Sequence, residues 1–281
     1  MIHIEVPGFG STVQGPADPF AFRAAQALVG NTDADAAIEA IGLPFAFRCD
    51  TSRIVAVTGR DVRIAVRDRV PAWTAVFVRA GDLVRIEGTA RSRYTYVAVS
   101  GGITTEVVLG SRAMYPRIGI GAALRAGDAL PLGTARRGAE DAGRAIAFEY
   151  SGEVAAVAGP HLDRFDAAAV SRFFGEGFVA SAQSDRQGAR LEGANVAPSG
   201  GEILSCGVVT GAVQVPRGGL PIVALADHGT TGGYPIIATV AEADLGYVAQ
   251  RAPGESLRFY RVERERALER AAALRDLLAT A

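Results

Sequence analysis

Short apolar runs, separated by Gly, Pro or Asp, dominate the first hundred residues of the chain. Apolar and polar residues alternate within several of these runs, which is the pattern of strands with one buried face. The glycines and prolines between the runs favour turns. The pattern predicts strands at residues 2–6, 36–41, 53–57, 62–66, 72–78, 83–87 and 93–100. Short strands at this spacing are typical of a β-barrel or a β-sandwich.

Three segments show helical spacing instead. Asp18 followed by Pro19 provides an N-cap and a first-turn proline for a helix that runs to Val29. A second short helix begins after Asp166 and ends at Gly175. Residues 263–278 place alanine and leucine at helical spacing among Arg and Glu, which predicts an amphipathic helix near the end of the chain.

A charged, glycine-containing segment at 134–144 lacks large apolar residues. Linkers between domains have this composition, so the sequence predicts domains at 1–140 and 141–281. In the second domain, apolar runs predict strands at 154–158, 178–181, 222–226 and 236–240. The chain is therefore expected to be mainly β, with a few short helices.

Composition narrows the functional classes. A net charge of −1 without a basic block argues against a nucleic-acid partner. The chain has no lysine, which excludes a Schiff-base lysine, a phosphate-loop lysine and covalently attached biotin. Two distant cysteines and three dispersed histidines predict neither a disulfide framework nor a metal site. No stretch reaches the roughly 18 apolar residues of a membrane span or has a secretory leader, so we expect a cytoplasmic protein without a membrane partner.

The loop at 227–235 is the main candidate site, because it places polar groups between two apolar strands. Its chemistry comes from a carboxylate, hydroxyls, a phenol and paired glycines, at Asp227, Thr230, Thr231, Gly232, Gly233 and Tyr234. Such groups can hold a carboxylate, a phosphate or a developing oxyanion. A glycine-rich turn whose hydroxyls bind its own backbone is an equally good interpretation. Nearby Gln214 faces either solvent or a cleft.

A second candidate is the charged segment 184–193, which begins at Ser184 and bends at Gly188. The planar guanidinium groups of Arg186 and Arg190 suit a carboxylate or phosphate. An ion pair between Asp185 and one of these arginines is the simpler interpretation, and from this segment alone it is favoured.

Several motifs occur in one order along the chain. The second half has Ser-Asp-Arg-x-Gly-x-Arg-Leu-x-Gly at 184–193, Gly-Ala-Val-Gln-Val-Pro at 211–216, Gly-Leu-Pro-Ile-Val-x-Leu-Ala-Asp at 219–227 and Thr-Thr-Gly-Gly-Tyr-Pro at 230–235. The first half adds Thr-Val-Gln at 12–14, Asp-Pro-Phe at 18–20 and Val-Leu-Gly-Ser-Arg at 108–112. Through these motifs nearly the whole chain resembles the biotin-dependent carboxyltransferase family. That family includes the C-subunit of bacterial 5-oxoprolinase, also labelled allophanate hydrolase subunit 2, and the carboxyltransferase region of urea carboxylase.

The resemblance implies two β-barrel-like domains, the C-terminal one cyclophilin-like. It also implies a companion subunit related to the other half of the carboxyltransferase unit and a third 5-oxoprolinase subunit. The implied activity is hydrolysis of a small lactam: ATP, bound by the complex, drives the opening of 5-oxoproline to glutamate. In the alternative, a carboxyl group passes from biotin on another chain to urea or a similar amide.

The resemblance also assigns roles to residues. Asp227 and Tyr234 are the catalytic candidates, with Asp227 as an acid, a base or an orienting group. The substrate-binding candidates are Ser184, Asp185, Arg186, Arg190, Gln214, Thr230, Thr231, Gly232 and Gly233. Among them, Arg186 or Arg190 would clamp a carboxylate.

The chain departs from the family pattern at two places. After Gln14 it runs through Gly15-Pro16-Ala17 directly into Asp18-Pro19, so a loop on the substrate side is expected to be missing. Ile236 stands where the family commonly has lysine, and Asp227-His228-Gly229 replaces the expected Asp-Arg-Gln. A diverged, non-catalytic binding or regulatory subunit is therefore a further alternative.

Overall fold

The computed structural model describes residues 1–13, 15–200 and 202–279, and its contacts group the chain into two compact units. The first unit comprises Met1–Glu149 with Asp276–Ala281, and the second comprises Tyr150–Arg275. Gln14, at the start of the connection where a loop is expected to be missing, lies outside the described residues.

Residues just beyond 140 contact the first unit. The backbone N–H of Ile146 donates to the carbonyl oxygen of Trp73 at 2.9 Å. The ring of Phe148 lies 4.5 Å from that of Phe20, measured between ring centroids. The boundary expected between residues 140 and 141 therefore lies inside the first unit, because these apolar and backbone contacts follow the charged segment.

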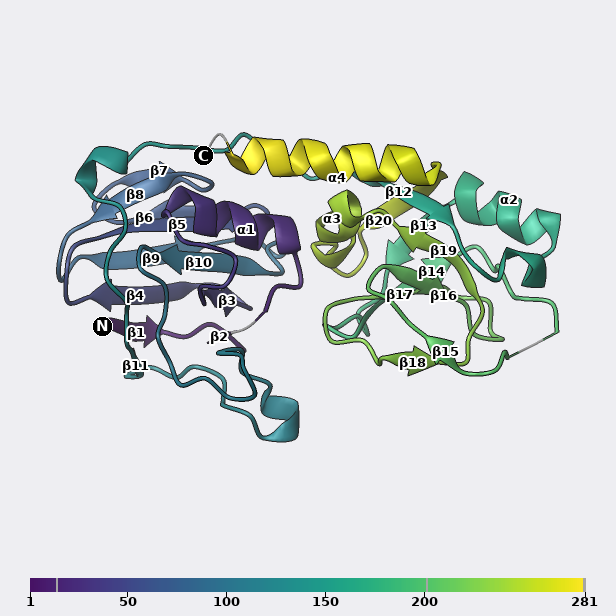
Figure 1. Cartoon of the computed structure of the whole chain (residues 1–281), viewed down its shortest axis with the longest axis horizontal. Coiled ribbons are helices and arrows are strands. Elements are labelled where there is room, and N and C mark those ends of the chain that lie inside the picture. The colour runs from purple at the N-terminus through teal and green to yellow at the C-terminus, as the bar shows by residue number, and fades with distance from the viewer. Residues whose placement is uncertain (14, 201, 280–281) are drawn as a thin grey trace. The chain divides into compact units, whose positions relative to one another are not determined.

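The first unit contains two antiparallel sheets (Figure 1). One has six strands in the order β11 (Ala129–Leu130), β1 (Ile2–Val6), β4 (Phe45–Cys49), β9 (Leu83–Glu87), β6 (Arg63–Ala65) and β7 (Arg69–Pro71). The other has five strands in the order β2 (Thr12–Val13), β3 (Ile38–Ala40), β10 (Thr95–Val99), β5 (Arg53–Gly59) and β8 (Ala75–Val78). Short 3-10 helices, η1 (Pro116–Ile118) and η2 (Ala139–Asp141), lie in its long connections.

One aliphatic core joins the two sheets. It contains Ile4 and Phe47 from the six-stranded sheet together with Val57 and Val97 from the five-stranded sheet. Two sheets that share a core form a sandwich. The resemblance implies a β-barrel-like first domain, and the sequence pattern allows a barrel or a sandwich. The described strands of this unit pair into two separate sheets, which is the sandwich.

Helix α1 (Pro19–Leu28) covers the outer face of the five-stranded sheet, against β5 and β10 (Figure 1). The Asp18 carboxylate accepts the backbone N–H of Ala21 at 3.1 Å, which confirms the predicted N-cap. Because β10 has α1 on one face and the core on the other, all five of its residues are buried.

A buried polar network fixes the entry to α1. The Tyr96 hydroxyl donates to the Glu39 carboxylate at 2.8 Å and accepts the backbone N–H of Asp18 at 2.8 Å. The backbone N–H of Ala17 donates to the same Glu39 oxygen at 2.9 Å. Burial raises the pKa of Tyr96 well above its usual value, and the carboxylates of Glu39 and Asp18 raise it further. Tyr96 therefore stays a neutral donor.

The second unit is a closed seven-stranded barrel. Its order is β12 (Glu153–Ala158), β19 (Ile236–Val240), β16 (Ala212–Gln214), β17 (Ile222–Ala224), β14 (Gly188–Gly193), β13 (Gly177–Ala180) and β20 (Ser256–Arg261). Neighbouring strands are antiparallel except β12 and β20, whose parallel pairing closes the barrel. A two-stranded sheet of β15 (Cys206–Gly207) and β18 (Thr231–Gly232) lies beside it (Figure 1).

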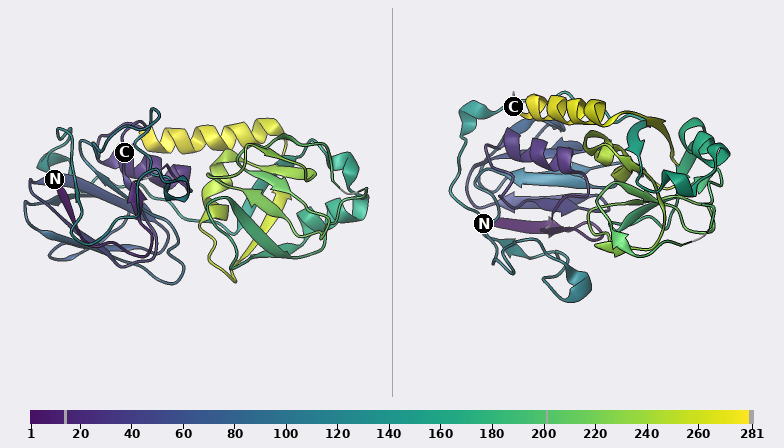
Figure 2. Two further views of the ribbon diagram at one scale, coloured as in Figure 1. Left: turned by 90° about the horizontal axis from the view of Figure 1, so that it is seen from below. Right: turned by 45° about the vertical axis from the view of Figure 1, so that its right-hand side comes forward.

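Helices of the second unit pack on the outside of the barrel, as both views of Figure 2 show for the long α4. They are α2 (Ala167–Gly175), α3 (Leu245–Ala249) and α4 (Arg264–Ala279), with the 3-10 helices η3 (Leu162–Arg164) and η4 (Glu242–Asp244). Phe173 of α2 stacks on Phe259 of β20 at 4.7 Å. Helix α4 buries Ala267 against Ala155 and Ala241, and both predicted helices of this half are confirmed.

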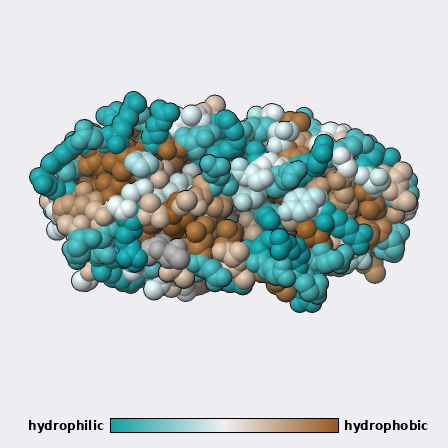
Figure 3. Space-filling model, turned by 90° about the horizontal axis from the view of Figure 1, so that it is seen from above, coloured by the Kyte–Doolittle hydropathy of each residue, from teal (hydrophilic) through white to brown (hydrophobic). Residues whose placement is uncertain are grey.

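The surface mixes both kinds of residue. On the face drawn in Figure 3, the side on which α4 lies in Figure 1, hydrophilic residues alternate with apolar areas. A folded surface normally has this mixture. None of the helices in the described part of the chain is both long and apolar enough to cross a bilayer.

Candidate functional site

The loop end of the barrel extends the pairing of β14 with β17 beyond both strands. The backbone N–H of Leu225 donates to the carbonyl oxygen of Gln187 at 3.0 Å, and that of Asp227 donates to the carbonyl oxygen of Arg186 at 2.9 Å. Two segments 41 residues apart in the sequence are thereby held side by side. The predicted turn at 184–193 is correspondingly shorter, because residues from Gly188 onward form β14.

Arg186 and Asp227 form a two-point ion pair at this end. Nε of Arg186 lies 2.9 Å from Oδ2 of Asp227, and Nη2 lies 3.0 Å from Oδ1. Their side chains are only 13% and 18% exposed. Both carboxylate oxygens and the Nε–Nη2 edge of the guanidinium are therefore occupied. This geometry suits orientation of the loop better than proton transfer by Asp227 or capture of a substrate carboxylate by Arg186.

Asp185 has a different partner from the one expected. Its Oδ1 accepts the backbone N–H groups of Gln187 and Gly188, at 2.9 and 3.2 Å. This is the local turn bonding that aspartate favours. The expected ion pair of Asp185 with Arg186 or Arg190 is thus replaced, because the turn aims the Asp185 carboxylate back at its own backbone.

The glycine-rich loop is half of a small sheet. Val208 donates its N–H to the carbonyl oxygen of Thr230 at 3.0 Å, and Ile203 donates to that of Gly233 at 2.9 Å. The side chain of Gln214 lies against Gly232 so closely that a Cβ on Gly232 would be 2.5 Å from its Nε2. The structure therefore brings Gln214 to the loop, and it explains glycine at 232 by this close approach.

Three hydroxyl groups of the loop remain available. Thr230, Thr231 and Tyr234 are exposed, and within the described part of the chain none of their hydroxyls has a protein hydrogen-bond partner. His228, by contrast, is held on both sides, by the carbonyl oxygen of Gly229 at 2.7 Å and the hydroxyl of Thr210 at 3.2 Å. The loop thus presents three free donors for an anion or a carbonyl oxygen.

Ile236 has a packing role. Its side chain is buried against Val208, Ala212 and Ala224, beneath the two-stranded sheet. Its backbone N–H donates to Nδ1 of His161 at 3.2 Å. An apolar side chain suits this place, because an unpaired charge here would be desolvated.

Arg190 lies apart from the Asp227 pair, on the outer face of β14. Its backbone exchanges hydrogen bonds with the hydroxyl of Ser184, at 3.0 and 3.2 Å. Arg190 lines a cavity of about 380 Å³, and its guanidinium has no ion-pair or hydrogen-bond partner among the described residues. The lining residues are Ser181, Gln183, Arg190, Leu191, Glu192, Pro216, Gly218, Leu220, Pro221 and Ile222. The sequence analysis did not identify Gln183, Glu192 or the apolar lining residues as part of a site. The only signal in the sequence was the pair of charged residues, Arg190 and Glu192, at alternate positions of a strand.

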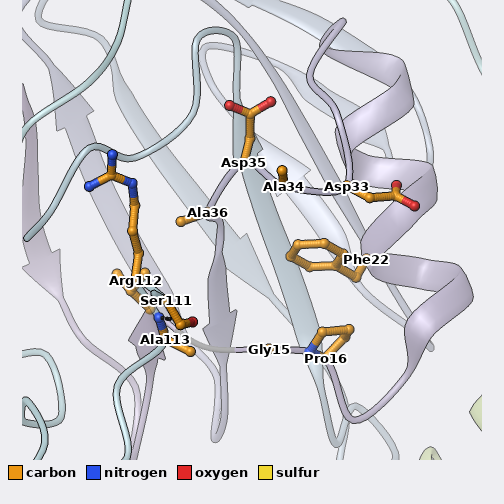
Figure 4. A pocket seen from close by; sticks show the side chains of 11 residues that line it. Gly15, Pro16, Phe22, Asp33, Ala34, Asp35, Ala36, Ser111, Arg112 and Ala113 are labelled. Atoms are coloured by element: carbon orange, nitrogen blue, oxygen red, sulfur yellow. Dashed lines mark hydrogen bonds between the residues drawn. The ribbon is translucent and has the colours of Figure 1, made fainter. Parts of the chain in front are cut away.

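The first unit contains a smaller cavity, of about 140 Å³, lined in part by Gly15 and Pro16 (Figure 4). Phe22 and Ala36 give it an apolar centre, while the Asp35 carboxylate points away from it (Figure 4).

The charged groups around this smaller cavity are engaged within the chain. Asp33 pairs with Arg23 at 3.2 Å, and Arg112 donates to the carbonyl oxygen of Thr105. Asp35 pairs with Arg136 at two points. Burial pushes the pKa of Asp35 upward, but hydrogen bonds from Arg136 and Thr32 outweigh it and hold that pKa below its ordinary value.

No group of three or more His, Cys, Asp or Glu side chains in the described ranges is arranged to hold a metal ion. Cys49 is buried, and burial raises the pKa of its thiol to about 11. A thiol in this state is a poor nucleophile.

Comparisons with known proteins cover most of the chain. It is 33% identical to the 5-oxoprolinase C-subunit of Escherichia coli, over 91% of this chain and 84% of that protein. It is 32% identical to the 5-oxoprolinase C-subunit of Haemophilus influenzae, over 95% and 87%. Urea amidolyase of Saccharomyces cerevisiae is more distant, 26% identical over 89% of this chain but only 15% of that protein.

A solved structure agrees with these relatives. The crystal structure of TTHA0988 superposes with a TM-score of 0.81 and 28% identity, covering 92% of this chain and 55% of that chain. Residues 9–261 match the carboxyltransferase domain, subdomain A and B, and therefore include both units almost entirely. The chain belongs to this carboxyltransferase domain family, as a homologue of the 5-oxoprolinase C-subunit.

Proposed function

We propose that the chain is a subunit of an ATP-dependent 5-oxoprolinase-type complex that opens 5-oxoproline to glutamate. The supporting observation is the extent of the match to the Escherichia coli C-subunit, 84% of whose length is covered. The chain thus corresponds to most of that subunit, whereas it corresponds to a small part of urea amidolyase. In this proposal the enzyme needs two further kinds of subunit, and ATP binds at the level of the complex.

In this proposal the glycine-rich loop binds the reacting amide. The free hydroxyls of Thr230, Thr231 and Tyr234 donate to the lactam carbonyl oxygen, where negative charge develops as water adds to the carbonyl carbon. Gly233 lets the substrate approach the backbone, whereas the space that Gly232 leaves is filled by the Gln214 side chain. The Arg186–Asp227 pair orients the loop, and Gln214 supports it at Gly232.

Reconstitution tests this function. The chain is co-purified with its companion subunits, and ATP hydrolysis and glutamate release are measured with and without 5-oxoproline. We expect hydrolysis to rise with 5-oxoproline; a complete complex without this stimulation contradicts the proposed function.

A single hydroxyl tests the site separately. Tyr234→Phe should lower turnover by roughly tenfold, because it removes one donor to the developing oxyanion. Tyr115→Phe, which removes a phenol hydroxyl from a loop of the first unit, is the matched control and should retain activity. Full activity of Tyr234→Phe would remove this loop from the mechanism while leaving the proposed function standing.

A carboxyltransferase acting on urea is the second candidate, favoured by the family itself and by the match to urea amidolyase. Biotin would have to be carried by another chain, because this one has no lysine. Consumption of carboxylated biotin that depends on urea, measured with the same complex, supports this candidate.

A non-catalytic binding or regulatory subunit is the third. It is favoured by the buried, apolar Ile236 at a position where the family commonly has lysine. This candidate is supported if a complete complex shows no stimulated ATP hydrolysis and no carboxyl transfer.

A further inference from the structure

The cavity on the outer face of the barrel has walls fixed by hydrogen bonds. Leu191 donates its N–H to the carbonyl oxygen of Pro221 at 2.9 Å, which holds the β16–β17 connection against β14. Asn195 donates through Nδ2 to the carbonyl oxygen of Gly218 at 3.0 Å, and Val196 donates to that of Gly219 at 2.9 Å. The cavity is therefore formed before any ligand arrives, as small-molecule sites usually are.

Two opposite charges reach this cavity from one strand. Leu191 points inward and is buried, so Arg190 and Glu192 on either side of it point outward. Both line the cavity, yet they form no ion pair with each other or with any other described residue. A guanidinium and a carboxylate on one wall complement a ligand that carries a carboxylate beside a nitrogen donor.

Another part of the cavity lining is apolar. It consists of Pro216, Pro221, Ile222 and Leu220, the last of which is 43% exposed. Apolar surface beside the charges lowers the local dielectric constant and strengthens their interaction with a ligand. The volume of about 380 Å³ lies at the small end of the usual range for ligand sites, about 300–1,000 Å³.

We infer that this cavity binds small α-carboxylates that carry an N–H group on the adjacent carbon, which include free α-amino acids and cyclic amides such as 5-oxoproline. Arg190 binds the carboxylate at two points, Glu192 accepts the N–H, and the apolar wall contacts the carbon skeleton. Gln183, which also lines the cavity, can add a donor or an acceptor through its amide. Because 5-oxoproline is the substrate in the proposed function, its place among these ligands rests on that function, whereas binding of free α-amino acids by the chain alone does not.

Calorimetric titration of the full chain, without ATP or other subunits, tests the inference. The probes are 5-oxoproline, L-proline and L-glutamate, with propionate and urea as ligands that lack one of the two recognised groups. At least one of the first three should bind more than tenfold more tightly than propionate and urea, and which one binds distinguishes a cyclic amide from a free amino acid. Absence of measurable binding by all three overturns the inference.

Variants locate the binding. Arg190→Gln should weaken binding by more than tenfold, whereas Arg217→Gln, the same change in the neighbouring connection but outside the cavity lining, should leave it unchanged. Glu192→Gln should weaken ligands with an ammonium group about tenfold and affect 5-oxoproline little, because glutamine still accepts a neutral N–H. Unchanged affinity in Arg190→Gln places any binding elsewhere and overturns the inference.

Discussion

The loop end of the barrel and its outer face each carry an arginine from the same hairpin, and the two arginines differ in what they contact. Arg186 forms an ion pair with Asp227 through two hydrogen bonds, and both side chains are little exposed to solvent. Arg190, four positions later, faces a cavity, and no described side chain pairs with it. One charge holds the fold together, while the other is available to a ligand.

The cavity of the first unit resembles the loop end in this respect. Its nearby acids are already paired, Asp33 with Arg23 and Asp35 with Arg136. A cavity lined by charges is therefore a weaker sign of a ligand site than a cavity lined by charges that the protein itself leaves unpaired.

The largest effect on stability is expected at an ion pair whose carboxylate is fully buried. Asp244 is completely buried and accepts hydrogen bonds from Arg270 of α4 and from the backbone N–H of Ala155. Arg270→Met strands this carboxylate and should lower the free energy of unfolding by about 3 kcal/mol. Chemical denaturation measures the change. Arg266→Met, on the same helix but in an exposed pair with Glu269, should cost less than about 0.5 kcal/mol.

If the free energy of unfolding of Arg270→Met stays within about 0.5 kcal/mol of the parent, water or another group must hydrogen-bond to Asp244. The ion pair with Arg270 would then contribute little to the stability of the fold.

Replacing Arg186 should lower the free energy of unfolding more than replacing Arg190, by a smaller margin than between Arg270 and Arg266. Arg186→Met leaves Asp227 partly buried without its partner and should cost about 2 kcal/mol, whereas Arg190→Met should cost less than about 0.5 kcal/mol. Denaturation of both variants under identical conditions measures the difference. Equal losses would remove the distinction between a charge held by the fold and a charge left for a ligand.

The smallest effect is a pH dependence at the cavity of the first unit. The folded pKa of Asp35 is lowered, so its ionised form adds stability above the unfolded value of about 4, and this contribution is lost as pH falls through the folded pKa. Asp35→Asn should therefore cost about 0.5 kcal/mol near pH 6, with the difference vanishing at lower pH.

Denaturation midpoints at several pH values measure this change. Asp33→Asn, in a more exposed pair, is the matched control and should have the smaller effect. A loss in Asp35→Asn that stays constant with pH would assign the effect to packing instead.

Helices α1, α2 and α4 were predicted correctly because their starts depend on residues close together in the sequence. Asp18 and Asp166 cap their helices through side-chain hydrogen bonds, and residues from 264 onward form α4. Strand β4 was missed, because Phe45–Cys49 follows directly on a turn and has little alternation. Pairing between distant strands was also beyond the sequence, which is why the same pattern is compatible with a barrel and with a sandwich.

The sequence predicted several residues of the candidate site, but it did not predict which of them contact one another. Asp227 was identified from its place in a polar loop, yet its partner Arg186 lies 41 residues away and only the pairing of β14 with β17 brings them together. Glu192 was overlooked because an exposed glutamate in a strand is usually only solvated. In the fold, Glu192 lines the same cavity as residues of the β16–β17 connection, and the sequence does not show this proximity.

The parallel pairing of β12 with β20 has a consequence for biosynthesis. Residues 153–156 pair with residues 258–261, so the barrel cannot close until its last strand has left the ribosome. At roughly 5–20 residues per second, about a hundred intervening residues leave β12 without this neighbour for some 5–20 seconds. A nascent or truncated chain ending before β20 exposes two strand edges, and such edges recruit other chains. Translation errors or stalling in this interval are therefore expected to yield aggregates rather than shortened barrels.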